Sequence, residues 1–446
     1  MTAAQKAGGD VLCKVVLTLQ SDTTTYTYGV DTTNRLLDLK HSENEWSQTA
    51  QISVDNRDGN LTGLTLEGCS AVISYGYHTT TDEYSATAPL EVIACKTDSM
   101  QGELVTTLSL AGVFNMMGED EASKAYMPDS ENRDTVKTIL TAIANKTLPC
   151  FTHCKSYTIT YDSEDSLIDT FKPADYFSVA FTESRLSAFR KALAFCKCKA
   201  RLQNDLGVAT IHIFNPTVSG TTYDYEYNDA MAAANHNFFN KSVRKRLVIP
   251  NKVIVLNHPD QGSYTGNATD ADSYAALGNR YIVEHHYARP ASNAQCTAIA
   301  EAMIQSYQIA AEKGHGFAPM NCGQEVMDYV KITDSRAGDT RVGNIGFLER
   351  HYSPGNFAFE FRFGSLFMPG LAGTLPPRGT LPTETEATTR EIIATLNQDI
   401  GNLYDVVSEL IANYNTLLTY LITREDVAVF KKLTVTEVMK IPGWDV

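Results

Sequence analysis

The feature that most constrains the fold of this chain is a heptad pattern of apolar residues between positions 388 and 423. Leu occupies every d position, and the seam consists of Ile393, Leu396, Ile400, Leu403, Val407, Leu410, Tyr414, Leu417 and Leu421. Such a seam predicts a coiled coil, because an apolar stripe along one helix has to be covered by a facing helix. Thr388 and Glu391 form a capping box that marks its start. The alternative is a helix that packs back onto the core of its own domain.

The seam leaves the number of associating helices open. β-branched Ile393, Ile400 and Val407 at a positions, combined with Leu at d, favour two helices. Apolar residues at flanking positions, such as Ile411 and Leu418, widen the buried face toward three or more helices.

Length and composition indicate a soluble protein of several domains. The 446 residues are 43% hydrophobic and 20% charged, which fits about two to four globular domains. The sequence has neither an apolar run long enough for a membrane span nor a secretory leader, so we expect no membrane anchor. We then expect the nine cysteines to be free thiols of a reducing compartment. A net charge of -15 argues against nucleic-acid binding, which requires clustered Lys and Arg.

Residues 1–115 are predicted to form a first β domain, either a sandwich or a barrel. Asp58 and Gly59 predict a tight hairpin turn within residues 56–60. Alternating or β-branched segments separated by turn residues predict strands at 11–19, 24–29, 48–54, 61–66, 71–77, 90–97 and 104–113.

Residues 116–240 are predicted to form a mixed α/β region, because the apolar period there becomes that of a helix. Two helices are expected at 135–145 and 183–195, and a following hairpin is expected from segments 197–203 and 208–214.

Residues 241–365 are predicted to form a second β domain. A polar loop is expected at 257–278, and Ser292 and Gln295 cap a helix that should continue to Lys313 and end at Gly314. Its strands are expected at 247–256, 281–287, 326–332, 340–351 and 356–364.

The rest of the chain divides into three predicted segments. Several prolines make residues 366–386 a semi-stiff linker. The coiled-coil helix follows at 387–424, and a short β segment at 425–446 ends in an apolar tip that contains Trp444.

No catalytic motif is present in the sequence, so we expect no catalytic residue, no cofactor and no metal. The best metal candidates are Cys150, His153 and Cys154 with Cys196 and Cys198, because zinc prefers thiolate and imidazole ligands. Their spacing lacks a paired CxxC, and Cys196 and Cys198 are expected on one face of a strand, as core residues are.

Two other polar clusters have a structural and a functional interpretation. His285 and His286 fall in a predicted strand, so their rings should point to opposite faces and cannot chelate one ion. The acidic stretch at residues 162–169 could hold Ca²⁺ or paired catalytic carboxylates, but no nucleophile stands nearby and a solvated loop is the simpler interpretation.

Residues 48–77 resemble the first β domain of phage tail baseplate hub proteins of the late-control-protein-D type. The similar segments are an alternating strand, then Val54-Asp55-Asn56-Arg57-Asp58-Gly59, Leu61-Thr62-Gly63-Leu64-Thr65-Leu66-Glu67-Gly68 and Ala71-Val72-Ile73-Ser74-Tyr75-Gly76. The order of elements at 184–214, 326–334, 341–350 and 357–364 is similar to the helix, central region and second barrel of that family. The resemblance covers about residues 10–365 through strand order and turn placement.

The resemblance implies a mainly β fold with an α+β insertion, two β-barrel-like hub domains and, in this chain, an added C-terminal coiled-coil helix. It also implies a homotrimer whose barrels form a pseudo-sixfold ring between the tail tube and a central spike or fibre. Expected partners are other copies and other tail proteins, namely a tube or distal tail ring and a spike or fibre. We expect Trp444 to contact another copy or a spike component, because the apolar tip is too short to bury itself. The expected location is the virion, with assembly in the host cytoplasm.

Two rival functions remain open at this level. A receptor-binding tail fibre or adhesin would recognise cell-surface carbohydrate with the tyrosine-rich segments at 74–84 and 222–227. In the second segment Tyr223, Tyr225 and Tyr227 alternate along a predicted strand, an arrangement that either stacks sugars or packs under a loop. A tail-associated peptidase or muralytic enzyme would instead need a polar cleft with converging titratable groups.

Overall fold

The computed structural model describes residues 6, 12–21, 24–29, 35–229, 236–238, 240–245, 247–258 and 263–364. The predicted linker, the coiled-coil seam, its capping box and Trp444 lie outside the described residues. No helix among the described residues is long and apolar enough to cross a membrane.

The first part of the chain is built from antiparallel strands. In β1, Val15, Leu17 and Leu19 alternate with more exposed residues and face the core, as expected for a half-buried strand. The strands are β1 (Cys13–Gln20), β2 (Thr25–Tyr28), β3 (Leu36–Asn44), β4 (Ser47–Asp55), β5 (Ser70–His78), β6 (Asp82–Ala86), β7 (Leu90–Met100) and β8 (Glu103–Ala111).

Several features of this part differ from the sequence-based prediction. Residues 61–66 form turns rather than a strand, because the buried Asn56 side chain accepts a hydrogen bond from the Leu61 amide at 2.9 Å and folds the segment over the core. Gly59 has the positive φ of +73° that a tight turn requires, but the turn joins no pair of strands. The polar strand β3 was not predicted, because its pairing with β4 and with β20 (Asp339–Ser353), rather than its composition, makes it a strand.

The middle part of the chain combines helices with a small sheet. Thr135 and Ser184 cap α3 and α5 through their side chains, accepting from the amides of Thr138 and Ser187, so both predicted helices are confirmed within a few residues. Strand β11 pairs with β10 in the predicted hairpin and runs parallel to β9. The elements are α2 (Val113–Glu119), α3 (Val136–Ala144), β9 (Thr158–Asp162), α4 (Leu167–Thr170), η2 (Ala174–Tyr176), α5 (Arg185–Leu193), β10 (Lys199–Asp205) and β11 (Val208–Phe214).

The last described part contains a second small sheet and a long helix. Strands β16, β15 and β17 form this sheet, and α7 packs on it so closely that a Cβ added at Gly266 would lie 2.2 Å from the Thr297 amide nitrogen. The elements are β12 (Tyr225–Asn228), β13 (His236–Asn237), β14 (Asn240–Lys245), β15 (Lys252–Asn257), β16 (Thr265–Thr269), α6 (Ala271–Ala276), β17 (Val283–Ala288), α7 (Asn293–Ala311), β18 (Glu312–Pro319), β19 (Tyr329–Asp334), β20 (Asp339–Ser353) and β21 (Asn356–Phe363).

The boundaries of this part correct three predictions. The predicted loop at 257–278 contains β16 and α6. Helix α7 begins at the predicted cap, where Ser292 accepts from the Gln295 amide at 3.2 Å, but it ends at Ala311, because Glu312 already continues as the extended strand β18. The strand expected at 247–256 begins only at Lys252.

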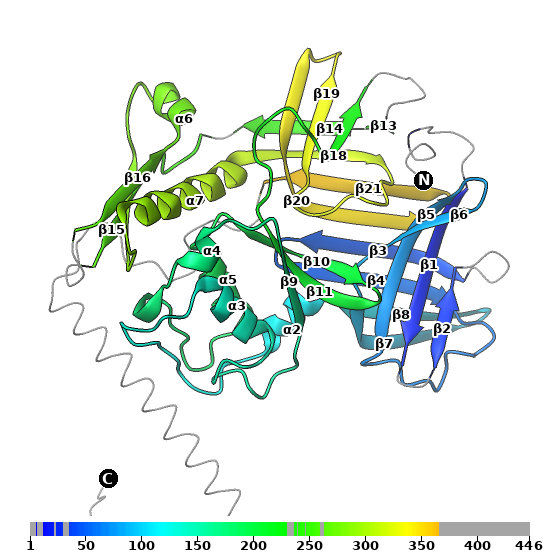
Figure 1. Cartoon of the computed structure of the whole chain (residues 1–446). Helices are drawn as coiled ribbons and strands as arrows, with labels where there is room; N and C mark the ends of the chain where they lie inside the picture. The colour runs from blue at the N-terminus through cyan, green and yellow to red at the C-terminus, as the bar shows by residue number, and fades with distance from the viewer. Residues whose placement is uncertain are drawn as a thin grey trace, which may run out of the picture.

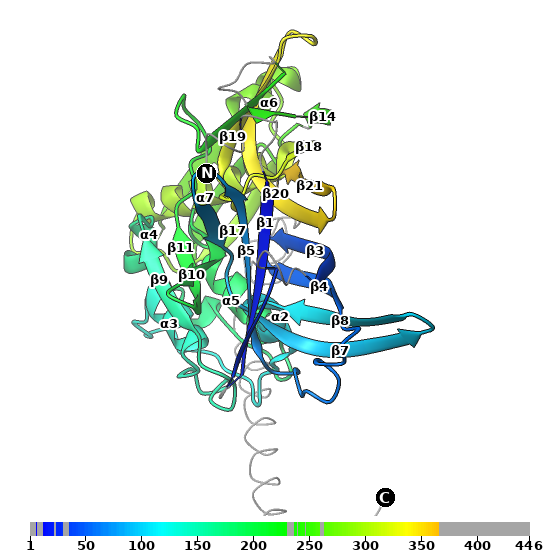
Figure 2. The ribbon, with the colours of Figure 1, turned by 90° about the vertical axis from the view of Figure 1, so that its right-hand side faces the viewer.

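The two predicted barrels are not separate closed barrels. Strands β3 and β20 pair antiparallel from Phe347 opposite Asn44 to Tyr352 opposite Leu39. Strands from both β regions therefore belong to one sheet, which has fifteen strands in the part of the chain that the structure describes. Figure 1 shows β20 lying beside β3, with β21 on the other side of β20. Among the described residues this sheet runs in an open order from β13 to β2, which corrects the barrel expectation while confirming a mainly β fold. Figure 2 shows the β7–β8 hairpin projecting away from the rest of the molecule.

The buried apolar side chains of the described residues form two large clusters. One cluster combines the middle part with β15 and α7, and Trp46 inserts into it from the turn after β3. The other cluster combines residues of β1, β4, β5 and β8 with residues of β19, β20 and β21. The continuous sheet and this shared core therefore bind the first and last β regions to each other.

Candidate functional site

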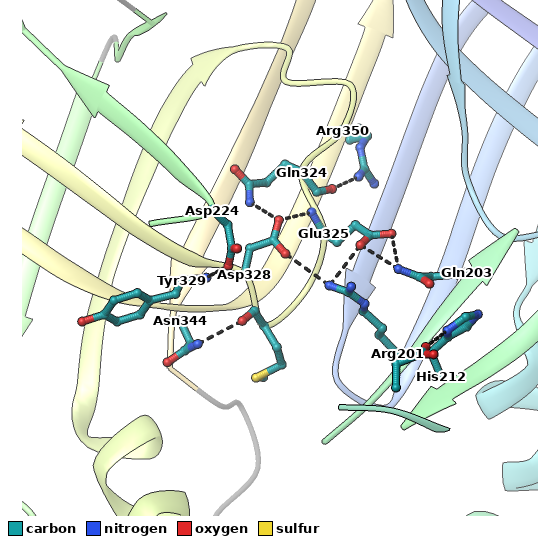
Figure 3. A network of polar contacts seen from close by, with 12 residues as sticks. Arg201, Gln203, His212, Asp224, Gln324, Glu325, Asp328, Tyr329, Asn344 and Arg350 are labelled. Atoms are coloured by element: carbon teal, nitrogen blue, oxygen red, sulfur yellow. Dashed lines mark hydrogen bonds and ion pairs between the residues drawn. The ribbon is translucent and has the colours of Figure 1, made fainter. Parts of the chain in front are cut away.

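The most connected group of polar side chains lies where the three predicted regions meet. Figure 3 shows most of this network between β10, the loop before β19, and β20. We call it the polar junction, and its members are Glu43 of β3, Arg201 and Gln203 of β10, Gln324, Glu325 and Asp328 of the loop before β19, and Arg350 of β20.

Arg201 joins the middle region to the loop before β19. One of its terminal nitrogens lies 3.2 Å from Asp328 Oδ1 and 3.0 Å from Glu325 Oε2. The Gln203 amide donates to both oxygens of the Glu325 carboxylate at 3.0 and 2.9 Å. Because β10 alternates its side chains, Arg201 and Gln203 project on the same side of the strand and reach the same loop.

Asp328 is a largely enclosed carboxylate of the polar junction, with a side chain that is 14% exposed. Its Oδ2 accepts hydrogen bonds from Gln324 Nε2 at 2.6 Å and from the Glu325 amide at 2.9 Å. Burial raises the pKa of Asp328 to about 7, against the opposing effects of the Glu325 amide and Arg201. This carboxyl group therefore exchanges its proton near neutral pH, although it lies inside the structure.

Arg350 joins the second β region to the first. Its side chain is 3% exposed and pairs with Glu43 of β3, and it also donates to the Gln324 carbonyl oxygen at 2.5 Å. Burial alone would raise the pKa of Glu43, but the Arg350 guanidinium lowers it below the usual value. In β3, two residues before Glu43, burial lowers the pKa of His41 to about 4, so this imidazole stays neutral at pH 7.

The polar junction has no room for a substrate. The cavity beside it, which is lined by Glu43, Gln48, Arg201 and Glu325 among others, has a volume of about 20 Å³. A single water molecule needs about 10–15 Å³ on this measure, whereas small-molecule sites measure about 300–1,000 Å³. Charged groups that are paired with one another around so small a space hold elements in place.

The structure places the predicted metal candidates in the core. Cys150, Cys154, Cys196 and Cys198 are all buried in the cluster around the middle region, and burial raises the pKa of Cys150 to about 12 and of Cys198 to about 11. Zinc binds thiolates, so metal binding here would first have to remove the protons that burial favours on these thiols. Among the described residues no group of three or more His, Cys, Asp or Glu side chains is placed to hold a metal ion. Cys196 and Cys198 precede β10 rather than lying within a strand, which corrects that detail.

The other predicted polar clusters are also used in structural contacts. In the acidic stretch, Glu164 and Asp169 both pair with Lys137 of α3, at 2.6 and 3.2 Å. Asp162 pairs with His212 of β11, whose other ring nitrogen lies 2.9 Å from Asp205. In β17, His286 is buried and lies 3.3 Å from Glu284, while His285 is half-buried.

The alternating tyrosines pack against protein groups. Tyr223 stacks on Tyr329 with ring centroids 5.7 Å apart. Tyr227 is fully buried, and its hydroxyl donates to Gln324 Oε1 at 2.8 Å, next to the polar junction. Tyr225 lies between the Tyr227 ring at 5.0 Å and the His236 ring at 5.5 Å. The aromatic row is thus part of the core and its margin.

The sequence analysis singled out none of the polar-junction residues as a site. For Arg350 the sequence does contain a signal. Arg350 lies two residues from both Leu348 and Tyr352 in β20, so the three side chains share the face of the strand that points to the core. An arginine at such a position indicates a buried ionic partner. For Arg201 and Asp328 the sequence gives no such signal, because their environment is created by contact between distant segments.

No family model matches the chain, and no curated protein matches it. Among solved structures, a tail protein from Neisseria meningitidis MC58 is similar, with a TM-score of 0.54 and 8% identity over 80% of this chain and 97% of that chain. Prophage tail protein gp18 from Listeria monocytogenes EGD-e is similar with a TM-score of 0.50 and 10% identity over 86% of this chain and 99% of that chain. These matches confirm the resemblance at the level of the fold, and the chain therefore has the fold of phage tail proteins.

Proposed function

We propose that this protein is a structural component of a phage or phage-like tail tip. Three copies form a baseplate hub ring that joins the tail tube to a central spike or fibre. In this proposal the protein is a virion component that assembles in the host cytoplasm, and its partners are its own copies and neighbouring tail proteins. It has no enzymatic activity of its own.

The observation that carries the proposal is the continuous sheet through β3 and β20. Strand pairing, a shared core and the Arg350–Glu43 ion pair join the two β regions of one chain. Such a unit resists relative movement of its halves, because movement would break ladder hydrogen bonds and separate a buried ion pair. A ring that bears load between a tube and a spike needs subunits with this rigidity.

The similarity to tail proteins supports the same role. It extends over 97% and 99% of the two matched chains, so it concerns their whole architecture rather than one common motif. The predicted domains at 1–115, 116–240 and 241–365 supply the body of each subunit in this proposal. The linker, helix and terminal segment at 366–386, 387–424 and 425–446 extend toward the spike or fibre and hold three copies together.

Native mass spectrometry of the full chain, followed by negative-stain electron microscopy of the same sample, tests the proposal. We expect three copies of the 49.0 kDa chain and closed rings with a central channel. A protein that is only monomeric or dimeric across the micromolar range would overturn the trimeric hub. Trimers without rings would leave an oligomeric fibre protein as the better description.

A further inference from the structure

A cleft of about 580 Å³ opens between α6, the C-terminal end of α7 and strands β19 and β20. Its walls combine the apolar side chains of Val248, Ile309 and Val342 with the polar groups of Asp270, Glu312 and Asn344. This volume lies within the range of about 300–1,000 Å³ that is typical of ligand-binding clefts. None of the residues that line the cleft belongs to the polar junction, so the proposed function does not use it.

The described part of the chain ends at the wall of this cleft. The amide of Gly364 donates to the Asn344 carbonyl oxygen at 2.9 Å. A Cβ added at Gly364 would lie 2.0 Å from the Glu312 carbonyl oxygen and 2.8 Å from that of Ile309. Gly364 therefore touches three residues that line the cleft, and its φ of +77° ends strand β21 there.

The residues that follow have the composition that the cleft requires. Ser365 is followed by Leu366, Phe367 and Met368, and then by Pro369 and Gly370. Three consecutive large apolar residues are unfavourable in water, and a nearby apolar wall is the simplest place to bury them. An extended chain advances about 3.3–3.6 Å per residue, so these side chains come within about 15 Å of Gly364.

We propose that residues 366–368 of the same chain dock into this cleft and anchor the start of the C-terminal extension to α7 and β20. The same chain is the occupant, because a segment that begins two residues after Gly364 has a far higher effective concentration at the cleft than any separate molecule. Docking would fix the point at which residues 369–446 leave the body. The inference is independent of the trimeric hub, because it concerns a contact within one chain.

Photo-crosslinking from position 367 tests this proposal in the full-length protein. Phe367 is replaced by p-benzoylphenylalanine, which keeps the aromatic ring and reacts with nearby C–H bonds on irradiation. We expect crosslinked peptides that contain residues 305–312 or 342–344, recovered from the gel band at the mass of one chain. The matched control carries the same amino acid at Leu381, within the predicted linker, and should give no crosslink to these walls.

Each other outcome contradicts the proposal. Crosslinks to the cleft that occur only in bands of two or more chains would mean that a neighbouring copy supplies the segment. Crosslinks elsewhere, or none at all, would mean that another group covers these residues. A second measurement uses hydrogen exchange of the full-length Phe367→Asp variant, in which amides at 342–344 and at the end of α7 should exchange faster while those of β1 stay unchanged. Equal exchange at both places would also count against docking.

Discussion

Removal of the Arg185 guanidinium should destabilise the middle of the protein more than any surface substitution. Arg185 is 0% exposed and begins α5. Its side chain donates to the carbonyl oxygens of Ile143, Ala144 and Lys155 at 2.6–2.9 Å and lies 2.9 Å from an Asp120 carboxylate oxygen. Ile143 and Ala144 are the last two residues of α3, so the Arg185 cation also faces the negative end of the α3 dipole.

The magnitude follows from the partners that lose their donor. Hydrogen bonds to charged groups contribute about 1.5–3 kcal/mol each, but they are not additive, and breaking one side of a buried ion pair costs about 3–5 kcal/mol. The Ala144 carbonyl keeps a second donor, the Tyr157 amide at 2.9 Å, and Asp120 is 25% exposed and regains water. We therefore expect Arg185→Met to destabilise α3 by about 3–5 kcal/mol. Arg185→Lys should lose about half as much, because a single ammonium cannot reach all four partners.

Native-state hydrogen exchange measures this effect locally, which is necessary because a chain with two buried clusters need not unfold in one transition. The opening free energy of α3 amides should fall by the stated amount, while amides of β1 in the other cluster stay unchanged. The matched control is Arg362→Met in β21, whose side chain is 49% exposed and pairs with Glu360. It should change stability by less than about 0.5 kcal/mol. If the opening free energies of α3 amides in Arg185→Met stay within about 1 kcal/mol of those in the unsubstituted protein, the capping role of Arg185 is refuted.

Four further predictions concern pH, packing and assembly. The Asp328 carboxyl has a pKa of about 7 in the folded state and about 3.9 in unfolded chains, so it binds more protons when folded and the free energy of unfolding should fall as the pH rises from about 4 to 7. In urea titrations at pH 5 and pH 8, Asp328→Asn should reduce this fall. Identical pH dependences of the variant and the unsubstituted protein would exclude Asp328 as its source. Gly266→Ala should lower the midpoint of thermal unfolding, because the added Cβ would meet the α7 backbone at 2.2 Å; an unchanged midpoint would show that α7 moves freely. Residues 386–446 expressed alone should be trimeric by light scattering and should dissociate when Leu403→Glu and Leu410→Glu charge the predicted seam. A stable dimer would contradict the trimer, and a monomer would contradict the coiled coil. Trp444→Ala should weaken assembly in sedimentation experiments without altering the circular dichroism of the body, and unchanged assembly would remove the proposed role of the terminal tip.

Local features of the fold could be predicted well from the sequence. The caps at Thr135, Ser184 and Ser292, and the alternation of Val15, Leu17 and Leu19, are formed by residues within a few positions of one another. Such interactions depend on backbone geometry and side-chain chemistry that short segments already contain. The resemblance to tail proteins had the same basis, because it followed strand order and turn placement.

Contacts between distant segments were decided only by the tertiary structure. The polar strand β3 exists because β4 and β20 supply partners on both of its edges. Arg201 and Asp328, 127 positions apart, become an ion pair only when β10 meets the loop before β19. The near-neutral pKa of Asp328 and the lowered pKa of Glu43 arise from the burial and the neighbouring charges that this meeting creates. The sequence by itself determined helices with local caps and strands with clear alternation, such as α3, α5, α7 and β1. The strand β3, strand pairing, burial and ionisation required the folded chain, because these properties depend on which distant groups replace water around each residue.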